Sequence, residues 1–271
     1  MRIAFIGDIV GRPGRKMVQQ YLKKSKEEFD IDFVIANGEN ASHGFGLTVK
    51  NAKELQKAGV DIFTGGNHTF DKKQDMMALL ESDYVLRPDN YPAGVPGSGL
   101  KIVDIDGEKL AILNLMGIYT MPTVENPFNW ATRVIEDLHN QDIKNIFIDF
   151  HAEATSEKRV MHMMFKSKVS AICGTHTHVG TDDLHISEGT AYVTDIGLTG
   201  CRDNVIGMNS KIPIQKATTG LGGHFEIPNS CKAIMQMLVI DISNGVSKEA
   251  FKIKYYSDDI QTNITKAIIE Q

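Results

Sequence analysis

Residues 1–11 read MRIAFIGDIVG, in which the apolar run Ile3–Ile6 leads into Gly7 and Asp8. A short apolar run that ends at a turn residue is typical of a buried strand. Residues 15–29 follow with the apolar spacing of an amphipathic helix. The chain therefore starts in β–α order, with a carboxylate at the carboxyl end of the first strand. The apolar run is also too short for the core of a signal peptide, so we expect no secretion leader.

The same alternation of strand and helix patterns continues along the chain. Strands are predicted at residues 33–36, 62–64, 145–150, 169–173 and 191–194, and helices at 48–58, 72–81, 129–140 and 156–165. Asp106-Gly107 and Asn244-Gly245 are two-residue hairpin signals, which add antiparallel strands to the parallel ones. We expect one α/β domain over residues 1–271, with two mixed sheets packed between helices. The segment from Cys201 to Ser230 shows no clear periodicity and receives no predicted structure.

Composition limits the partners of this chain of 271 residues. Its formal net charge of −5 supplies no basic field for a long nucleic acid, so the expected partner is a small anionic substrate held at a local positive site. The apolar runs are too short to span a membrane. Cys173, Cys201 and Cys231 lie far apart without C-x-x-C spacing, which argues against a disulfide framework and a structural zinc site. A reducing, cytoplasmic location is expected, and homo-oligomer formation is left open.

Polar residues of the metal-ligand type follow one predicted strand after another. They are Asp8, Glu39, Asn40, Asn67, His151, His176 and His178. In open α/β sheets, ligands bind at the carboxyl ends of the strands. These seven donors are therefore expected to meet at one site, although they are widely separated in the sequence.

Single members of this set have ordinary structural interpretations. Asp8 alone can cap a helix, and Asn40 or Asn67 alone is common in turns. The T-H-T-H segment differs, because His176 and His178 at positions i and i+2 of extended chain face the same side. Together with the other residues at strand ends, this pair predicts a metal site.

The segments around these donors resemble the calcineurin-like metallophosphoesterase superfamily, and within it the bacterial YmdB-like phosphodiesterase family. The motifs that carry the resemblance are Gly7-Asp8, Gly38-Glu39-Asn40, Gly66-Asn67-His68, the lone His151 and Gly174-Thr175-His176-Thr177-His178. Val10 stands where the superfamily has a histidine ligand, and Glu39 stands where it has an aspartate. The YmdB-like family shares both departures and uses the asparagine that corresponds to Asn40. DFHAEATSEKR at 149–159 and TDIGLTG at 194–200 are also similar to that family.

The resemblance implies a four-layer sandwich of two mixed sheets flanked by helices, and a site for two metal ions. One ion would be bound by Asp8, Glu39, Asn40 and His178, and the other by Asn67, His151, His176 and the shared carboxylate of Glu39. Oxygen and nitrogen ligands without thiolate suit iron, manganese, cobalt or zinc. Two divalent or mixed-valence ions are therefore the expected cofactors, and the resemblance favours iron or manganese.

The implied function is hydrolysis of small phosphodiesters, and the resemblance points to 2′,3′-cyclic or 3′,5′-cyclic nucleotides. In two-metal sites a bridging water loses a proton near neutral pH, and the hydroxide attacks the phosphorus in line. His68 is the candidate catalytic acid for the leaving alkoxide, because imidazole titrates near neutrality. His43, in the glycine-rich ENASHGFG segment, is the candidate for substrate binding.

Two alternative functions stay open at this stage. One is a two-metal hydrolase that acts on an ester or amide, and the other is a regulatory protein that binds metal or nucleotide. A dinucleotide-binding or P-loop enzyme is disfavoured, because Gly11-Arg12-Pro13-Gly14 after the first strand matches neither glycine-rich motif.

Overall fold

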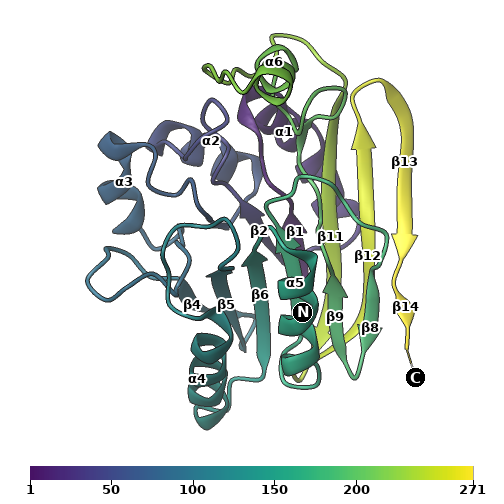
Figure 1. Ribbon diagram of the computed structural model, residues 1–271. Coiled ribbons are helices and arrows are strands. Elements are labelled where there is room, and N and C mark those ends of the chain that lie inside the picture. The colour runs from purple at the N-terminus through teal and green to yellow at the C-terminus, as the bar shows by residue number, and fades with distance from the viewer. Residues whose placement is uncertain (271) are drawn as a thin grey trace.

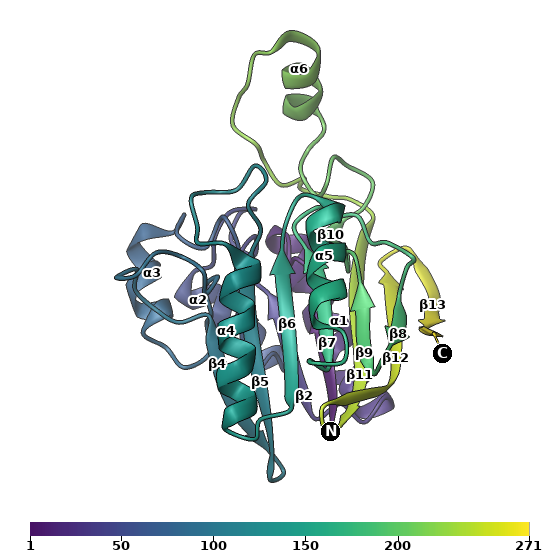
Figure 2. The same cartoon turned by 60° about the horizontal axis from the view of Figure 1, so that its bottom comes forward.

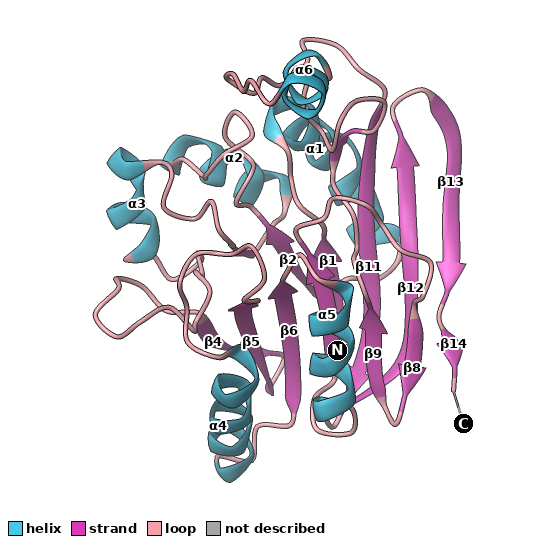
Figure 3. Ribbon diagram, in the orientation of Figure 1, coloured by secondary structure: helices cyan, strands magenta, loops and turns pink. Residues whose placement is uncertain are grey.

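Two mixed sheets form the centre of the computed structural model, which describes residues 1–270 (Figure 1, Figure 3). The first sheet contains β1 (Arg2–Ile6), β2 (Phe33–Asn37), β3 (Ile62–Thr64), β10 (Gly200–Cys201), β11 (Ala233–Ser243), β12 (Val246–Tyr256) and β13 (Asp259–Lys266). Its strand order is β13-β12-β11-β1-β2-β3, and β10 pairs with β11. The first strand therefore lies inside the sheet, parallel to β2 and antiparallel to β11.

The second sheet is also mixed. It contains β4 (Leu100–Ile105), β5 (Glu108–Met116), β6 (Asn145–His151), β7 (Ala171–Thr175), β8 (His185–Ser187), β9 (Thr190–Val193) and β14 (Ile268–Ile269). Its order is β14-β8-β9-β7-β6-β5-β4, with β5, β6, β7 and β9 parallel to one another. The predicted hairpin at Asp106-Gly107 is confirmed, because β4 and β5 pair antiparallel on either side of it.

Helices cover the outer faces of both sheets. They are α1 (Gly11–Glu28), α2 (Val49–Ala58), α3 (Lys73–Leu80), α4 (Pro127–Asn140) and α5 (Thr155–Phe165), whereas the sixth helix, α6 (Lys211–Thr219), buries no residue. Side chains of α1, α2 and α3 share a core cluster with the first sheet, and side chains of α4 and α5 share one with the second sheet. The ribbon shows α4 and α5 beside the strands of the second sheet (Figure 1). A third cluster lies between the sheets, where the Phe5 and Phe147 rings are 5.0 Å apart. The expected four-layer sandwich is thus confirmed.

The alternation of side chains along β1 explains these layers. Ala4 and Ile6 belong to the cluster with the helices, whereas Ile3 and Phe5 belong to the cluster between the sheets. All four are completely buried, as expected of a strand covered on both faces. The continuous apolar run at the start of the sequence therefore places Asp8 at the carboxyl end of a central strand.

Residues 202–230, which we call the α6 loop, depart most from the sequence predictions. This segment had no predicted structure, but it contains α6, which stands away from the sheets in Figure 2. The expectation that the cysteines are unpaired is wrong for two of them, because Cys201 and Cys231 form a disulfide at the base of the α6 loop. The pairing of β10 with β11 brings these distant positions together, which their spacing in the sequence does not reveal. Cys173 is buried and free.

Within residues 1–270, which the structure describes, no helix is both long enough and apolar enough to cross a lipid bilayer.

Candidate metal centre

The carboxyl ends of five strands meet where the two sheets face each other. The first sheet supplies Asp8 after β1, Glu39 and Asn40 after β2, and Asn67 after β3, whereas the second sheet supplies His151 at the end of β6 and His176 and His178 after β7. The structure therefore brings the predicted donors of both sheets to one region. Their roles as metal ligands remain a prediction.

Three donors converge on the imidazole of His151. Its Nε2 atom is 2.9 Å from Asn67 Oδ1, 3.1 Å from Glu39 Oε1 and 3.1 Å from His176 Nδ1. Ligand atoms of Glu39, His151 and His176 all lie within 4.8 Å of one another. We call this group the second metal position. One carboxylate, one amide oxygen and two imidazoles suit a first-row transition metal.

Asp8, Asn40 and His178 form a neighbouring group, which we call the first metal position. Asp8 Oδ1 is 3.7 Å from His178 Nε2. Among the described residues, Asp8 Oδ1 and Asn40 Oδ1 are buried and accept no hydrogen bond. Leaving a buried polar oxygen without a partner costs roughly 1–3 kcal/mol, and more when the group is charged. A bound cation would satisfy both oxygens, so the residues present fit a metal ion.

Hydrogen bonds set the orientation of two of these imidazoles. His178 Nδ1 is 2.8 Å from the carbonyl oxygen of Ile206, which can only accept, so the proton lies on Nδ1 and the lone pair of Nε2 faces Asp8. His151 Nδ1 is 2.9 Å from Thr175 Oγ1, and that hydroxyl donates to Asp149 Oδ1 at 2.7 Å. His151 Nδ1 must then donate, which leaves its Nε2 free to bind a metal. Such outer partners are a regular part of metal sites.

Burial and charge oppose each other at Glu39 and His151. Burial favours a raised pKa for Glu39, but His151 and His68 together outweigh burial and lower the Glu39 pKa to about 2. Burial likewise favours a lowered pKa for His151, but the carboxylates of Glu39, Asp8 and Asp149 together raise the His151 pKa to about 9. At neutral pH the pair thus holds a proton that a metal ion would displace, so metal uptake should release protons.

Two buried charges hold the turn that carries His176 and His178. Both histidines have positive φ values, +94° and +63°, so they lie in a strained turn after β7. Asp195 Oδ2 accepts hydrogen bonds from the backbone and the hydroxyl of Thr177, at 3.2 and 2.8 Å. Lys158 Nζ donates to Asp195 Oδ2 and to the carbonyl of Thr175, both at 2.8 Å. The lysine and the aspartate are each about 1% exposed.

These supporting residues were missed as functional residues in the sequence. Asp149 and Lys158 belong to DFHAEATSEKR, and Asp195 belongs to TDIGLTG, the two phrases that were noted only for their resemblance to the family. Burial raises the pKa of Asp149 to about 7, against the opposing effect of His151. The phrases therefore mark residues that position the histidines.

His68 is next to the ligand group but outside it. Its backbone N–H donates to Glu39 Oε2 at 2.9 Å, and its Nδ1 is 2.8 Å from Asp71 Oδ2. The ring meets Phe45 edge to face, with centroids 4.9 Å apart. His43 is exposed, with a φ of +60°, and its role in substrate binding remains a prediction. In that loop it is Phe45, two residues further on, that reaches the cavity described next.

A cavity of about 210 Å³ opens onto the metal centre. Its floor is formed by Glu39, Asn40, His68, His176 and His178, and its walls by Phe45, Val205, Ile206, Met208, Pro213 and Phe225. Most of the wall belongs to the α6 loop. The polar lining residues thus come from the metal centre and its neighbour His68, whereas five of the six apolar ones come from the α6 loop.

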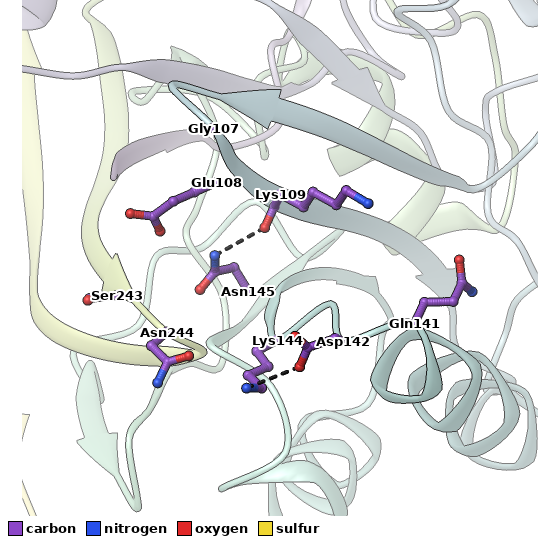
Figure 4. A pocket seen from close by; sticks show the side chains of 9 residues that line it. All are labelled: Gly107, Glu108, Lys109, Gln141, Asp142, Lys144, Asn145, Ser243 and Asn244. Carbon is purple, nitrogen blue, oxygen red and sulfur yellow. Dashed lines mark hydrogen bonds and ion pairs between the residues drawn. The ribbon is translucent and has the colours of Figure 1, made fainter.

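A larger hollow of about 460 Å³ lies at the amino end of β6 (Figure 4). It is lined by residues of strand ends and of the turns beside them, and two of its polar groups already have partners. Lys144 pairs with Asp142 at 3.1 Å, and Asn145 donates to the carbonyl of Lys109 at 3.0 Å. It contains none of the seven predicted donors. The smaller cavity at the metal centre is therefore the candidate site.

Comparisons with known proteins agree with this geometry. The chain is 43% identical over 255 residues to the 2′,3′-cyclic-nucleotide 2′-phosphodiesterase of Bacillus subtilis (strain 168), which covers 94% of this chain and 96% of that protein. It is 37% identical over 260 residues to a putative phosphatase/phosphodiesterase of Mycoplasma genitalium, covering 92% of this chain and 90% of that protein.

Two solved structures and a family model also match most of the chain. A novel phosphatase from Mycoplasma pneumoniae superimposes with a TM-score of 0.90 at 33% identity, covering 96% of this chain and 95% of that chain. A hypothetical protein from Thermus thermophilus gives 0.87 at 34% identity, covering 98% of this chain and 100% of that chain. The model of the family described as YmdB-like protein matches residues 4–255. Because this match covers nearly the whole chain, the protein belongs to the YmdB-like family.

Proposed function

We propose that the protein is a dinuclear-metal phosphodiesterase that hydrolyses cyclic nucleotides. The observation that carries the proposal is the convergence of seven donors from both sheets, two of them with buried oxygens that accept no hydrogen bond. The printed names of the relatives, a cyclic-nucleotide phosphodiesterase and a phosphatase/phosphodiesterase, support the phosphoric diester as the bond that is cut. The first of these names favours 2′,3′-cyclic over 3′,5′-cyclic nucleotides.

The donors divide between the two metal positions. Asp8, Asn40 and His178 would hold the first ion, Asn67, His151 and His176 the second, and Glu39 would contribute to both. When bound, two such ions supply Lewis-acid activation of a water and of the phosphate oxygens. The mixed oxygen and nitrogen donors favour iron or manganese over calcium.

The protein's own residues then have three tasks. With only Asp8 and Glu39 charged among neutral donors, the loaded centre keeps a net positive charge that attracts a phosphate anion. Asp71 accepts the Nδ1 proton of His68, so the opposite nitrogen, Nε2, is the atom that would hold the proton for the leaving oxygen. The apolar walls of the α6 loop exclude bulk water from the floor of the cavity.

Metal analysis and a substrate panel in one preparation test the proposal. The purified protein is stripped of metal with a chelator and reloaded with iron, manganese or zinc. It is then assayed on 2′,3′-cyclic AMP, 3′,5′-cyclic AMP, an ester (nitrophenyl acetate) and an anilide (an acyl nitroanilide). We expect two ions per chain and hydrolysis of a cyclic nucleotide that depends on them. Hydrolysis of the ester or anilide alone would favour the alternative hydrolase, and nucleotide binding without turnover would favour a regulatory protein.

A substitution at Asn40 tests the division into two positions. Asn40 Oδ1 is the buried atom without a donor, and its Nδ2 is held by the carbonyl of Gly44 at 3.0 Å. Asn40→Ala should therefore remove about one metal equivalent per chain, measured by plasma mass spectrometry, whereas Asn40→Asp should retain both. Two equivalents in the alanine variant, or none, would contradict the assignment.

A further inference from the structure

We propose that the cavity between the α6 loop and the metal centre binds the aromatic base of a nucleoside phosphodiester, and that it accepts different bases. The inference rests on the proposed function, because it assigns the part of the substrate that is not phosphate. It makes the α6 loop, which had no predicted role, the element that selects the substrate.

The first observation is that two kinds of residue line the cavity, polar ones from the metal centre and apolar ones mostly from the α6 loop. Its floor consists of the proposed metal ligands and His68, which would face the phosphate, whereas its walls are apolar. A nucleotide has the same division, with an anionic phosphodiester at one end and a flat ring with apolar faces at the other. A volume of about 210 Å³ is suited to one ring system and not to a long chain.

Two aromatic rings supply surfaces for stacking. Phe45 belongs to the loop after β2 and lies edge to face against His68, so it borders the place of the leaving group. Phe225 belongs to the part of the α6 loop that follows α6. Lys216 Nζ lies 5.8 Å from the centroid of its ring. Both phenylalanines are partly exposed in the cavity, which leaves ring surface for a ligand. Aromatic side chains bind bases by stacking with little preference among them.

The side chains of the walls carry no group that could distinguish one base from another. Val205, Met208 and Pro213 carry no side-chain donor or strong acceptor. The backbone carbonyl of Ile206 is already used by His178 Nδ1. Recognition of a base edge needs hydrogen bonds at fixed positions, so the cavity should select for a flat ring and not for its identity.

Close contacts hold the wall in place over the floor. A Cβ atom at Gly44 would lie 2.6 Å from Met208 Cε, and one at Gly207 would lie 2.9 Å from Val10 Cγ1. Val10 is the residue that stands where the superfamily has a metal ligand, and here it is completely buried beside the α6 loop. The hydrogen bond from His178 to Ile206 adds a direct link between wall and metal centre. These contacts therefore fix the position of the proposed base site relative to the proposed phosphate site.

Steady-state kinetics with and without a base test the inference. The metal-loaded full chain is assayed on the four 2′,3′-cyclic nucleotides and on glycerol 1,2-cyclic phosphate, which has the phosphodiester but no base. We expect kcat/KM for every nucleotide to exceed that for the base-free substrate by about 5- to 150-fold, the range of one stacked base. The four nucleotides should differ from one another by less than about tenfold.

Variants of Phe225 locate the effect in the cavity. Phe225→Ala should lower kcat/KM for the nucleotides by about 5- to 150-fold more than for glycerol 1,2-cyclic phosphate, mainly through KM. Phe225→Trp should restore the preference, and Phe225→Leu should not. Leu221→Ala is the matched control, because Leu221 belongs to the same loop but is 66% exposed and does not line the cavity.

The outcomes separate the two proposals. Equal kcat/KM for the base-free and base-bearing substrates, or an equal loss on both in folded Phe225→Ala, would overturn the base subsite and leave the phosphodiesterase intact. Strong selection for a single base would overturn base tolerance. Failure to hydrolyse any of these phosphodiesters in the metal-loaded protein would reject the proposed function, and the inference with it. Circular dichroism of each variant establishes that it is folded.

Discussion

Gly66 packs directly against two of the predicted metal ligands. A Cβ atom there would lie 2.3 Å from His151 Nε2 and 2.4 Å from Glu39 Oε2. Since His151 is completely buried, it has no free space into which to move. We expect Gly66→Ala to lower bound metal and kcat/KM by about 10- to 100-fold, the cost of disturbing ligand orientation. Plasma mass spectrometry checks the metal content. Gly222→Ala is the control, because no atom lies within 4 Å of its added Cβ, and an unchanged Gly66→Ala would contradict the geometry.

His68 can be distinguished from the ligands by the leaving group of the substrate. If its Nε2 protonates the leaving oxygen, His68→Ala should keep both metal ions and lower turnover of a cyclic nucleotide by about 10²- to 10⁴-fold. A nitrophenyl phosphodiester needs less protonation, so its turnover should fall less. The measurement is the ratio of the two losses, taken together with metal content. Equal losses accompanied by loss of metal would make His68 a ligand, and normal rates on both substrates would make it structural.

At the scale of elements, the contact of α5 with β8 and β9 contains a pH-sensitive group. His162 of α5 stacks on Tyr192, with centroids 4.4 Å apart, and lies 5.0 Å from the ring of His185. Both of its nitrogens are buried and, among the described residues, have no hydrogen-bond partner. Burial first, and then the charges of His185 and neighbouring cations, lower the pKa of His162 to about 4.

This shift fixes the sign of a pH effect on stability. The unfolded chain takes up a proton below pH 6.5, whereas the folded protein does so only near pH 4, so the free energy of unfolding should fall as pH drops from 6.5 to 4. One such group can contribute a slope of up to about 1.4 kcal/mol per pH unit. Urea titrations across this range measure it. His162→Phe, which keeps a ring against Tyr192, should flatten the slope, and an unaltered slope would assign it to other groups.

Elements differ in how far the sequence could predict them. The β4–β5 hairpin and the strand ends follow from local signals, because Asp106-Gly107 fixes a turn and an apolar run fixes a strand. For the same reason the donors could be named, since each lies at or just after the carboxyl end of a strand. The Lys158–Asp195 pair could not be found in this way, because the interaction joins two charged residues 37 positions apart that composition alone would place on the surface. The disulfide and the wall of the cavity depend in the same way on long-range pairing.

At the scale of the whole molecule, the candidate metal centre contains residues of both sheets. Asp8 and Glu39 belong to the first sheet, and His151 and His176 to the second. A metal that binds only the folded protein stabilises it by about 2.7 kcal/mol at a free concentration 100 times its Kd. For a chain of this size we expect Tm to rise by roughly 5–10 °C. Calorimetry with metal, and again with chelator, checks the shift. Gly66→Ala should show a smaller rise, and an equal rise in both proteins would place the stabilising ion elsewhere.

The position of β1 in the first sheet has a consequence for synthesis on the ribosome. One neighbour of β1 is β2 at Phe33–Asn37, but the other is β11 at Ala233–Ser243. At 5–20 residues per second, roughly 10–50 s separate the emergence of β1 from that of β11. All seven donors emerge in that interval. During it, β1 lacks its neighbour β11, so the first sheet, which supplies four of the donors, is incomplete. If these donors bind metal, we therefore expect loading only after β11 has been translated, and until then the open edge of β1 is a place where another nascent chain could pair.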